Sequence, residues 1–182
     1  MTTQTTAVAT WTIDPTVSSA EFGIKHMTIS TVKGRFGTVS GTLRFDGQDL
    51  TTASVEVTID VASVTTNEPQ RDAHLRSPDF FAVDAHPTLT FHSTGVTHVR
   101  EDEYHIAGEL TIRETTRPVT LDATYGGHIT DPDGLQRAGF TADTTISRKA
   151  FGLSWNALLE TGGVVWSDKV EVTLHIEATR NA

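Results

Sequence analysis

The sequence predicts an all-β protein, a single antiparallel barrel of eight strands, on the strength of three observations. Apolar and polar residues alternate with a period of two in one segment after another, as they do on strands with one dry and one wet face. Thr is abundant and Val recurs, and β-branched side chains favour strands over helices. Short turns join these segments in hairpin order, and closing such a meander into a barrel removes its exposed edges.

Two long strands begin the pattern. The alternating residues of the first are Ala20, Phe22, Ile24 and His26. The second is expected over residues 36–45, after a turn at Lys33-Gly34. Gly37 and Gly41 interrupt this second strand, and glycine inside a strand indicates a bulge or the sharp coiling of a closing barrel.

Six further strands repeat the alternation. The third has Val55, Val57, Ile59 and Val61 on one face, and Glu56 and Asp60 on the other. The remaining five are expected around residues 89–91, 106–112, 119–125, 140–146 and 170–176. Glycine-rich and proline-containing turns, at 126–127 and 131–134, separate some of them as hairpin turns do.

Two segments break the alternation. The first, residues 67–83, is expected to contain a short helix with Asn67 as its N-cap and Pro69 in its first turn. The second, residues 151–166, carries two of the three tryptophans and is expected to form an irregular lid. Aromatic side chains in both segments would then cover or rim a barrel mouth.

Length and composition suit one domain. A chain of 182 residues buries most of its apolar surface without needing a metal or disulfides. We expect a disordered tail over residues 1–10 and one barrel domain over 11–180. The chain has no cysteine, which excludes thiol catalysis, disulfides and cysteine-based metal sites. Its apolar runs are far shorter than the roughly 18 residues of a transmembrane helix, so no membrane insertion is expected.

The chain is acidic, with 14 Lys and Arg against 23 Asp and Glu, for a formal net charge of -9. This charge argues against a nucleic-acid or anionic-membrane partner, although it is compatible with a local basic patch. The N-terminal segment has neither the basic nor the apolar region of a secretory signal, so a cytoplasmic location is expected. The long strands and the polar outer face that they predict are compatible with a monomer or a homodimer.

Several short motifs follow one another along the chain in an order that resembles a known protein family. The opening reads Trp11-x-Ile13-Asp14-Pro15, Ser18-Ser19-Ala20-Glu21-Phe22-x-Ile24-x-His26 and Lys33-Gly34-x-Phe36. The middle reads Arg71-Asp72-x-His74-Leu75-x-Ser77-x-Asp79-Phe80-Phe81 and His86-Pro87-x-Leu89-x-Phe91-x-Ser93. The end reads Gly108-x-Leu110-Thr111-Ile112, Arg117-Pro118-Val119, Gly139-Phe140-x-Ala142 and Arg148-x-x-Phe151-Gly152. In this order the chain resembles the YceI-like family of lipocalin-like, polyisoprenoid-binding proteins.

The resemblance implies a lipocalin-like barrel whose hydrophobic tunnel binds, and carries or sequesters, a long-chain isoprenoid or fatty lipid. It implies a binding protein without a cofactor rather than an enzyme. Two features depart from the family. Glu114 stands where members usually have Gly, and the chain shows no signal peptide, whereas many members are periplasmic.

The residues expected to contact a ligand share an inward position on a strand or an aromatic position in an irregular segment. They are Phe22, Ile24, His26, Phe36, Leu75, Phe80, Phe81, Phe91, Leu110, Phe140, Ile146, Phe151, Trp155 and Trp166. Alternation alone leaves open whether these residues line a hollow barrel or fill a solid one with a structural or stress role. The resemblance favours the hollow barrel.

A site for a phosphate group and a site for a metal ion are two alternatives to the apolar one. A phosphate-bearing ligand would need local cations, for which the candidates are Lys25, Lys33, Arg35 and Arg148-Lys149. Of the eight histidines, His92 and His98 share a strand face but lie about 20 Å apart if extended, so no metal is expected.

An enzyme on the same barrel is the runner-up hypothesis. It would act on a small hydrophobic substrate through a buried histidine such as His26, with Asp14, Asp72 or Asp79 as a carboxylate partner. His26 in the apolar register is more simply a core histidine. The sequence holds no nucleophile elbow, phosphate loop or dinucleotide fingerprint, so no catalytic residue is assigned.

Overall fold

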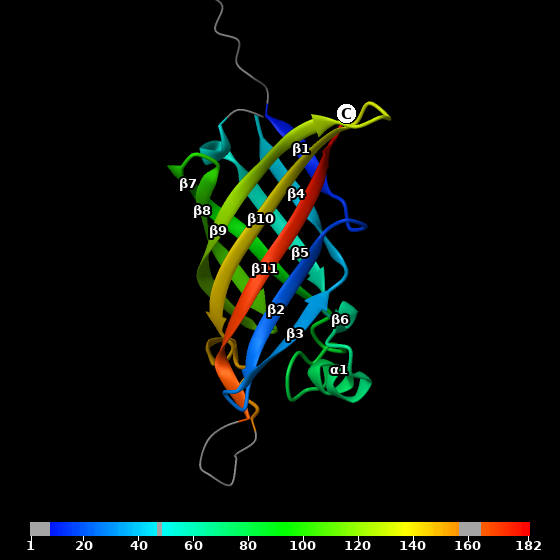
Figure 1. The fold of residues 1–182 in the computed structure, drawn as a ribbon, viewed down its shortest axis with the longest axis vertical. Helices are drawn as coiled ribbons and strands as arrows, with labels where there is room; N and C mark the ends of the chain where they lie inside the picture. Colours follow the sequence, from blue (N-terminus) through cyan, green and yellow to red (C-terminus); the bar gives the residue numbers. More distant parts are fainter. Residues whose placement is uncertain (1–7, 47–48, 157–164) are drawn as a thin grey trace, which may run out of the picture.

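The computed structural model describes residues 8–46, 49–156 and 165–182, and these form one antiparallel sheet closed on itself (Figure 1). The strands are β1 (Ala9–Ile13), β2 (Ser19–His26), β3 (Ser30–Phe36), β4 (Val39–Phe45), β5 (Ser54–Asp60), β6 (Val64–Thr65), β7 (Thr88–Arg100), β8 (Glu103–Ile112), β9 (Thr115–Thr130), β10 (Gln136–Ser147) and β11 (Trp166–Arg180). The helical elements are α1 (Pro69–Arg76) and three short turns, η1 (Leu50–Thr52), η2 (Val61–Ser63) and η3 (Lys149–Phe151).

The eleven strands occupy eight positions around the barrel. β1 and β2 both pair antiparallel with β11, at residues 178–180 and 166–175 respectively, so they act as one interrupted strand. β3 and β4 form a second interrupted strand, because β3 pairs with β2 and β4 pairs with β1 and β5. From β5 the order continues through β7, β8, β9 and β10 to β11. The predicted eight-stranded up-and-down barrel is confirmed.

Hydrogen bonds hold the offset between β1 and β2 in place. The Thr16 backbone N–H and hydroxyl both donate to Asp14, at 3.0 and 2.6 Å, and Arg137 reaches the same carboxylate at 3.3 Å. These hydrogen bonds, first from the Thr16 hydroxyl, lower the pKa of Asp14 below its ordinary value. The Asp14 backbone N–H also donates to the Glu177 carbonyl on β11 at 2.8 Å, which ties the offset to the strand beside it.

The first hairpin differs from the prediction. The turn lies at residues 27–29, whereas Lys33 and Gly34, expected in a turn, are inside β3 and pair with Gly23 and Phe22. The predicted strand over residues 36–45 is broken, because β3 ends at Phe36 and β4 begins at Val39. Glycine is typical of turns, but Gly34 serves another purpose here: its lack of a side chain makes room for the ring of Phe22 within the strand pair.

Two short strands were not predicted. β1 places Ala9 and Thr10 in the barrel, so these two residues do not belong to the tail expected over residues 1–10, of which the first seven lie outside the described residues. Its Trp11 is buried and stacks on Phe45 with ring centroids 5.1 Å apart. β6 adds two residues beside β3. Elements this short carry too few alternations to be recognised.

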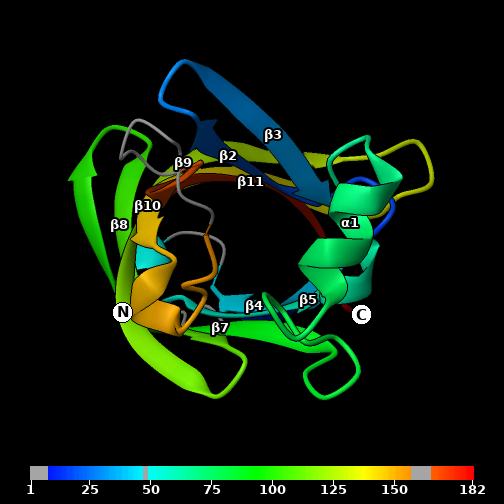
Figure 2. The ribbon, with the colours of Figure 1, turned by 90° about the horizontal axis from the view of Figure 1, so that it is seen from below.

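The predicted short helix is present but begins and ends elsewhere. α1 spans Pro69–Arg76, and its N-cap is Glu68, whose carboxylate accepts hydrogen bonds from the backbone of Gln70 and Arg71 at 3.1 and 2.7 Å. Asn67, the expected cap, instead takes a left-handed backbone with φ 62°. Viewed along the barrel, α1 sits on the rim of one end (Figure 2). We call this the α1 end, and the end with the β9–β10 turn and the C-terminus the far end.

Candidate functional site

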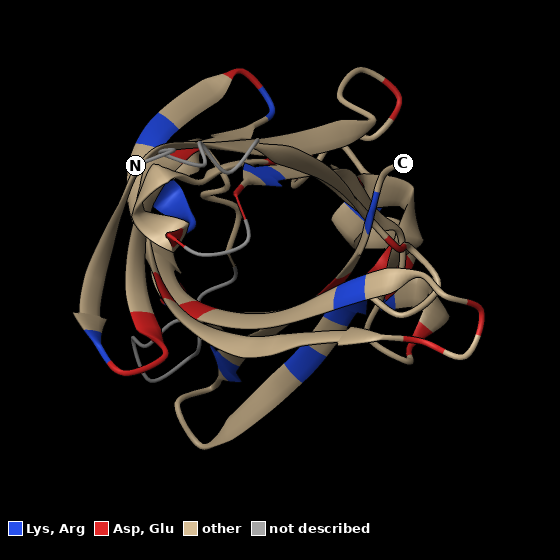
Figure 3. Cartoon of the chain, turned by 90° about the horizontal axis from the view of Figure 1, so that it is seen from above, with Lys and Arg blue, Asp and Glu red and all other residues tan. Residues whose placement is uncertain are grey.

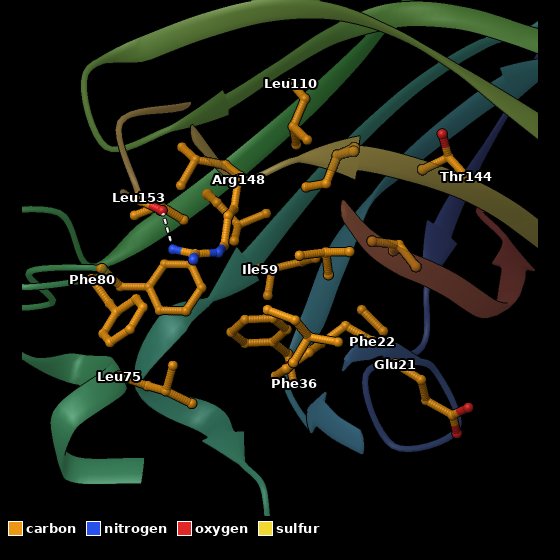
Figure 4. A pocket seen from close by; sticks show the side chains of 18 of the residues that line it. Glu21, Phe22, Phe36, Ile59, Leu75, Phe80, Leu110, Thr144, Arg148 and Leu153 are labelled. Carbon is orange, nitrogen blue, oxygen red and sulfur yellow. Dashed lines mark hydrogen bonds between the residues drawn. The ribbon is translucent and has the colours of Figure 1, made fainter. Parts of the chain in front are cut away.

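The barrel is hollow at the α1 end. A cavity of about 190 Å³ lies inside it, and a single buried water needs only roughly 15 Å³ on a comparable measure. Side chains from β2, β3, β5, β7, β8, β9, β10 and β11 surround it, and α1 with the following turn covers one side (Figure 4). The described residues thus leave an apolar cavity at this end of the barrel.

The cavity wall is almost entirely hydrocarbon. Inward positions alternate with solvent-facing ones along each strand, so the apolar residues of the alternating pattern face the cavity. Phe22 and Phe36 lie 5.5 Å apart between ring centroids, and Phe81 meets Phe36 edge-on at 5.7 Å. Leu110 and Ile146 complete the apolar wall from β8 and β10. A surface of this kind binds an apolar ligand by excluding water rather than by hydrogen bonding.

A second, smaller apolar cavity of about 60 Å³ lies toward the far end. Both cavities are lined in part by the same four residues, Val57, Phe91, Leu121 and Leu174. The far cavity is bounded at its other side by Phe45 and Phe140, whose rings meet edge-on at 6.4 Å. The apolar interior therefore extends along the barrel beyond the main cavity.

Most of the expected ligand contacts line the main cavity. These are Phe22, Ile24, Phe36, Leu75, Phe80, Phe81, Phe91, Leu110, Ile146 and Trp166. Four do not. His26 packs against Trp166 with ring centroids 4.6 Å apart and tilted rings, Phe140 lines the far cavity, Phe151 is buried in η3, and Trp155 packs edge-on against His74 at 4.4 Å.

The expected lid over residues 151–166 is only partly described, since residues 157–164 lie outside the described residues. Its first residues accept hydrogen bonds from Arg148, a buried arginine that lines the main cavity. The guanidinium donates to the carbonyls of Ser167, Leu153 and Trp155 at 2.8, 2.6 and 2.8 Å, and to that of Trp166 at 3.3 Å. Burial lowers the pKa of Arg148, partly offset by nearby Asp168.

Arg148 was considered as a cation for an anionic ligand, but its geometry gives it a structural role. With four backbone carbonyls around it, the guanidinium ties η3 and residues 153–155 to the start of β11. Lys149, next to it, is exposed. The other predicted cations, Lys25, Lys33 and Arg35, are exposed on the outside of the β2–β3 hairpin and do not line the cavity.

A histidine and a carboxylate do meet at the cavity rim, although not at His26. His74 on α1 lies 2.8 Å from Asp79, and both side chains are substantially exposed, at 36% and 51%. Asp72, another suggested partner, is committed elsewhere: it accepts hydrogen bonds from the backbone N–H and hydroxyl of Thr66 at 2.7 and 2.5 Å. Asp14 fixes the β1–β2 offset at the far end.

Most of the remaining histidines each face a carboxylate. His92 faces Glu109 at 3.1 Å and His105 faces Asp122 at 3.0 Å, each across neighbouring strands. Within the described ranges, no group of three or more His, Asp or Glu side chains gathers in a way that could hold a metal ion.

Several lining residues were not predicted. Val32 on β3 shares the inward face with Gly34 and Phe36, and placing the turn at residues 27–29 would have revealed it. Val119 and Val172 follow the alternation of strands that were predicted, so the signal for both was present. Arg71, which binds Thr66 through its side chain at 2.7 Å, had only its place in the resemblance to mark it.

Comparison with known proteins agrees with this architecture. The family model for the YceI-like domain matches residues 11–178. The chain belongs to the YceI-like family. A UPF0312 protein of Pectobacterium atrosepticum is 42% identical to this YceI-like chain over 160 residues, which cover 88% of the chain and 80% of that protein. The sequence resemblance to this family is confirmed.

Solved structures show the same barrel. The crystal structure of the Campylobacter jejuni YceI protein is 31% identical and superposes with a TM-score of 0.75, over 87% of this chain and 91% of that one. A polyisoprenoid binding domain from Saccharophagus degradans, implicated in plant cell wall breakdown, superposes with a TM-score of 0.72 at 16% identity, over 96% and 100%. Among the described residues of this YceI-like protein, no helix is long and apolar enough to cross a membrane.

Proposed function

We propose that this YceI-like protein binds one long-chain apolar lipid, of the polyisoprenoid class, inside its barrel, and carries or sequesters it. The observation that carries this proposal is the cavity, whose wall is built from the inward side chains of eight strands. The printed description of the Saccharophagus degradans neighbour as a polyisoprenoid binding domain supports it. So does the family to which the chain belongs.

The shape of the interior suits an extended chain. The main and far cavities adjoin at shared residues, and an elongated guest that displaced side chains such as Leu121 would use both as one tunnel. Burying each CH₂ group is worth roughly 0.8 kcal/mol before the costs of association. A few isoprene units therefore supply useful affinity without a polar anchor.

Binding accounts for the site better than catalysis does. An acid–base enzyme needs a histidine and a carboxylate facing the substrate, usually shielded from water. The His74–Asp79 pair is instead partly exposed at the rim, and edge-on contacts with Phe80 and Trp155 surround His74. We assign this pair to holding α1 against the following turn.

Lipid extraction tests the proposed function. We expect organic extracts of the native protein, purified without detergent, to contain an apolar chain at about one molecule per protein by mass spectrometry. Protein stripped of lipid should then rebind geranylgeraniol, and a linear alcohol of equal length in competition distinguishes isoprenoid from fatty ligands. Blank extracts together with no rebinding of either alcohol would overturn the proposal.

A further inference from the structure

The tip of the β2–β3 hairpin, residues 27–29, presents apolar side chains to solvent at the α1 end of the barrel. Ile29 is 86% exposed, more than any other large hydrophobic side chain among the described residues, and Met27 beside it is 39% exposed. Single exposed apolar residues are common on protein surfaces, but two at one projecting tip are less so. The tip therefore needs an explanation beyond ordinary surface composition.

The backbone of the tip strengthens this point. Met27 and Thr28 both have left-handed conformations, with φ 53° and 61°. Turn positions with positive φ are normally occupied by Asn, Asp or Gly, because these residues tolerate that conformation. Here Met occupies the first position. The turn is nonetheless held firmly, since the Met27 N–H donates to the Val165 carbonyl at 2.7 Å and the Ile29 N–H donates to that of His26 at 3.2 Å.

Cations flank the apolar tip. Lys25, Lys33 and Arg35 point outward from the same hairpin, are exposed, and form no ion pair within 4 Å in the described part of the chain. The nearest acidic residue of the hairpin, Glu21, faces His175 at 3.6 Å. Figure 3 shows Lys and Arg along this hairpin, on a chain whose net charge is -9. The hairpin is thus locally basic on an acidic protein.

The other face of the hairpin lines the main cavity. Phe22, Ile24 and Val32 are inward residues of β2 and β3. Trp166 at the start of β11, which packs against His26 near the tip, also lines the cavity. The hairpin, with Trp166 of β11 beside it, therefore connects the tip to the ligand site.

We propose that the β2–β3 tip is the surface with which the protein contacts a lipid bilayer carrying anionic headgroups. Met27 and Ile29 enter the boundary of the acyl chains, and Lys25 and Lys33 face the headgroup phosphates, as at other interfacial sites. The ligand then passes between bilayer and cavity without crossing water. The passage rests on the proposed lipid binding, whereas the bilayer contact itself does not.

The acidic remainder of the protein limits how strong this contact becomes. A net charge of -9 repels an anionic surface as a whole, so only the local cations and the apolar tip attract. The contact is therefore reversible and shallow, and differs from insertion of a membrane-spanning segment. A carrier needs a reversible contact of this kind when it takes up its ligand from the bilayer.

Flotation with lipid vesicles tests the contact on the full chain, with no ligand added. The vesicles are of phosphatidylcholine alone or with a minor fraction of phosphatidylglycerol. We expect Ile29→Asp to weaken association with the mixed vesicles roughly tenfold, because it removes apolar burial and adds repulsion. Ile129→Asp is the matched control, since Ile129 is 66% exposed at the far end. It should bind like the wild type.

Two further measurements separate the parts of the proposal. Lys25→Gln with Lys33→Gln should weaken binding to mixed vesicles and leave the weaker binding to phosphatidylcholine unchanged. Geranylgeraniol dissolved at low concentration should bind the Ile29→Asp variant as it binds the wild type, while transfer from vesicles slows. The bilayer contact is refuted if Ile29→Asp and Ile129→Asp bind the mixed vesicles equally well. It is also refuted if light scattering shows that Ile29→Asp dissociates a dimer while vesicle binding stays unchanged.

Discussion

Two glycines, each on a strand that pairs with the strand carrying an aromatic residue, let the rings lie against the cavity wall. The ring of Phe22 on β2 lies over Gly34 on β3, in the space that a side chain at Gly34 would take. The ring of Phe91 lies over Gly108 in the same way, and a side chain at Gly108 would also meet the His92 carbonyl. At the scale of single residues, we therefore expect the width of the cavity to depend on these two ring–glycine contacts.

Gly34→Ala should narrow the cavity. The added methyl group would overlap the Phe22 ring. We expect the ring to relieve the overlap by turning into the cavity. We expect the affinity for geranylgeraniol to fall and the free energy of unfolding to drop by about 1–2 kcal/mol, as for other overpacked sites. Ligand titration and urea unfolding measure the two effects.

Gly37→Ala is the control for Gly34→Ala. A methyl group at Gly37 would meet only the Arg35 side chain, at 3.7 Å, which is an ordinary contact. Affinity and stability should therefore stay close to those of the wild type. Equal loss of affinity in both variants would show that the Phe22 ring does not set the width of the cavity.

At the scale of elements, hydrogen bonds hold α1 to the barrel, in addition to the apolar contact that Leu75 makes with the core. Asp72 accepts from the N–H and hydroxyl of Thr66 just after β6. Arg76 donates to the Val64 carbonyl at 2.9 Å and to that of Ala62 at 3.2 Å. The α1 helix that covers the ligand site therefore depends on a charged, hydrogen-bonded junction.

Asp72→Asn should weaken this junction in a pH-dependent way. Burial raises the pKa of Asp72, but the hydrogen bonds from Thr66 outweigh it and leave the pKa below its ordinary value. A lowered pKa in the folded state stabilises the protein above the ordinary value near 3.9, and this contribution is lost as the pH falls through the lowered pKa. We expect a loss of about 1–2 kcal/mol at neutral pH, shrinking below about pH 4.

Urea unfolding of the wild type and the Asp72→Asn variant across this pH range measures the difference. Asp84→Asn, an exposed carboxylate beyond the same helix, is the control and should leave the stability unchanged. A difference between wild type and Asp72→Asn that stayed constant down to acid pH would show that the Asp72 charge plays no part.

The elements also show what a sequence can and cannot reveal. Long strands such as β10 and β11 carry many alternations, so their existence and inward faces were predicted. The N-cap at Glu68 was missed because Asn67 is the stronger cap by residue type, and only the three-dimensional path of the chain places Glu68 to accept both N–H groups. His26 followed the inward register, yet at the hairpin end its ring turns to Trp166 instead of the cavity.

At the scale of the whole molecule, closure of the barrel turns a sheet into a container. β11 is the strand that closes it, since it pairs with β10 on one side and with both β1 and β2 on the other. Eight strand positions leave an interior just wide enough for packed side chains or one slender ligand. Inward side chains of different sizes therefore decide whether each level of the barrel is filled or hollow.

Leu121 on β9 sits at the level where the two cavities adjoin, so Leu121→Trp should separate them. If a ligand extends through both cavities, the variant should bind a long polyprenyl alcohol at least roughly tenfold more weakly, while a short one such as geraniol retains its affinity in the main cavity. Val99→Trp, at an exposed position on β7, controls for the added indole. Equal weakening for short and long alcohols would show that the ligand uses the main cavity alone.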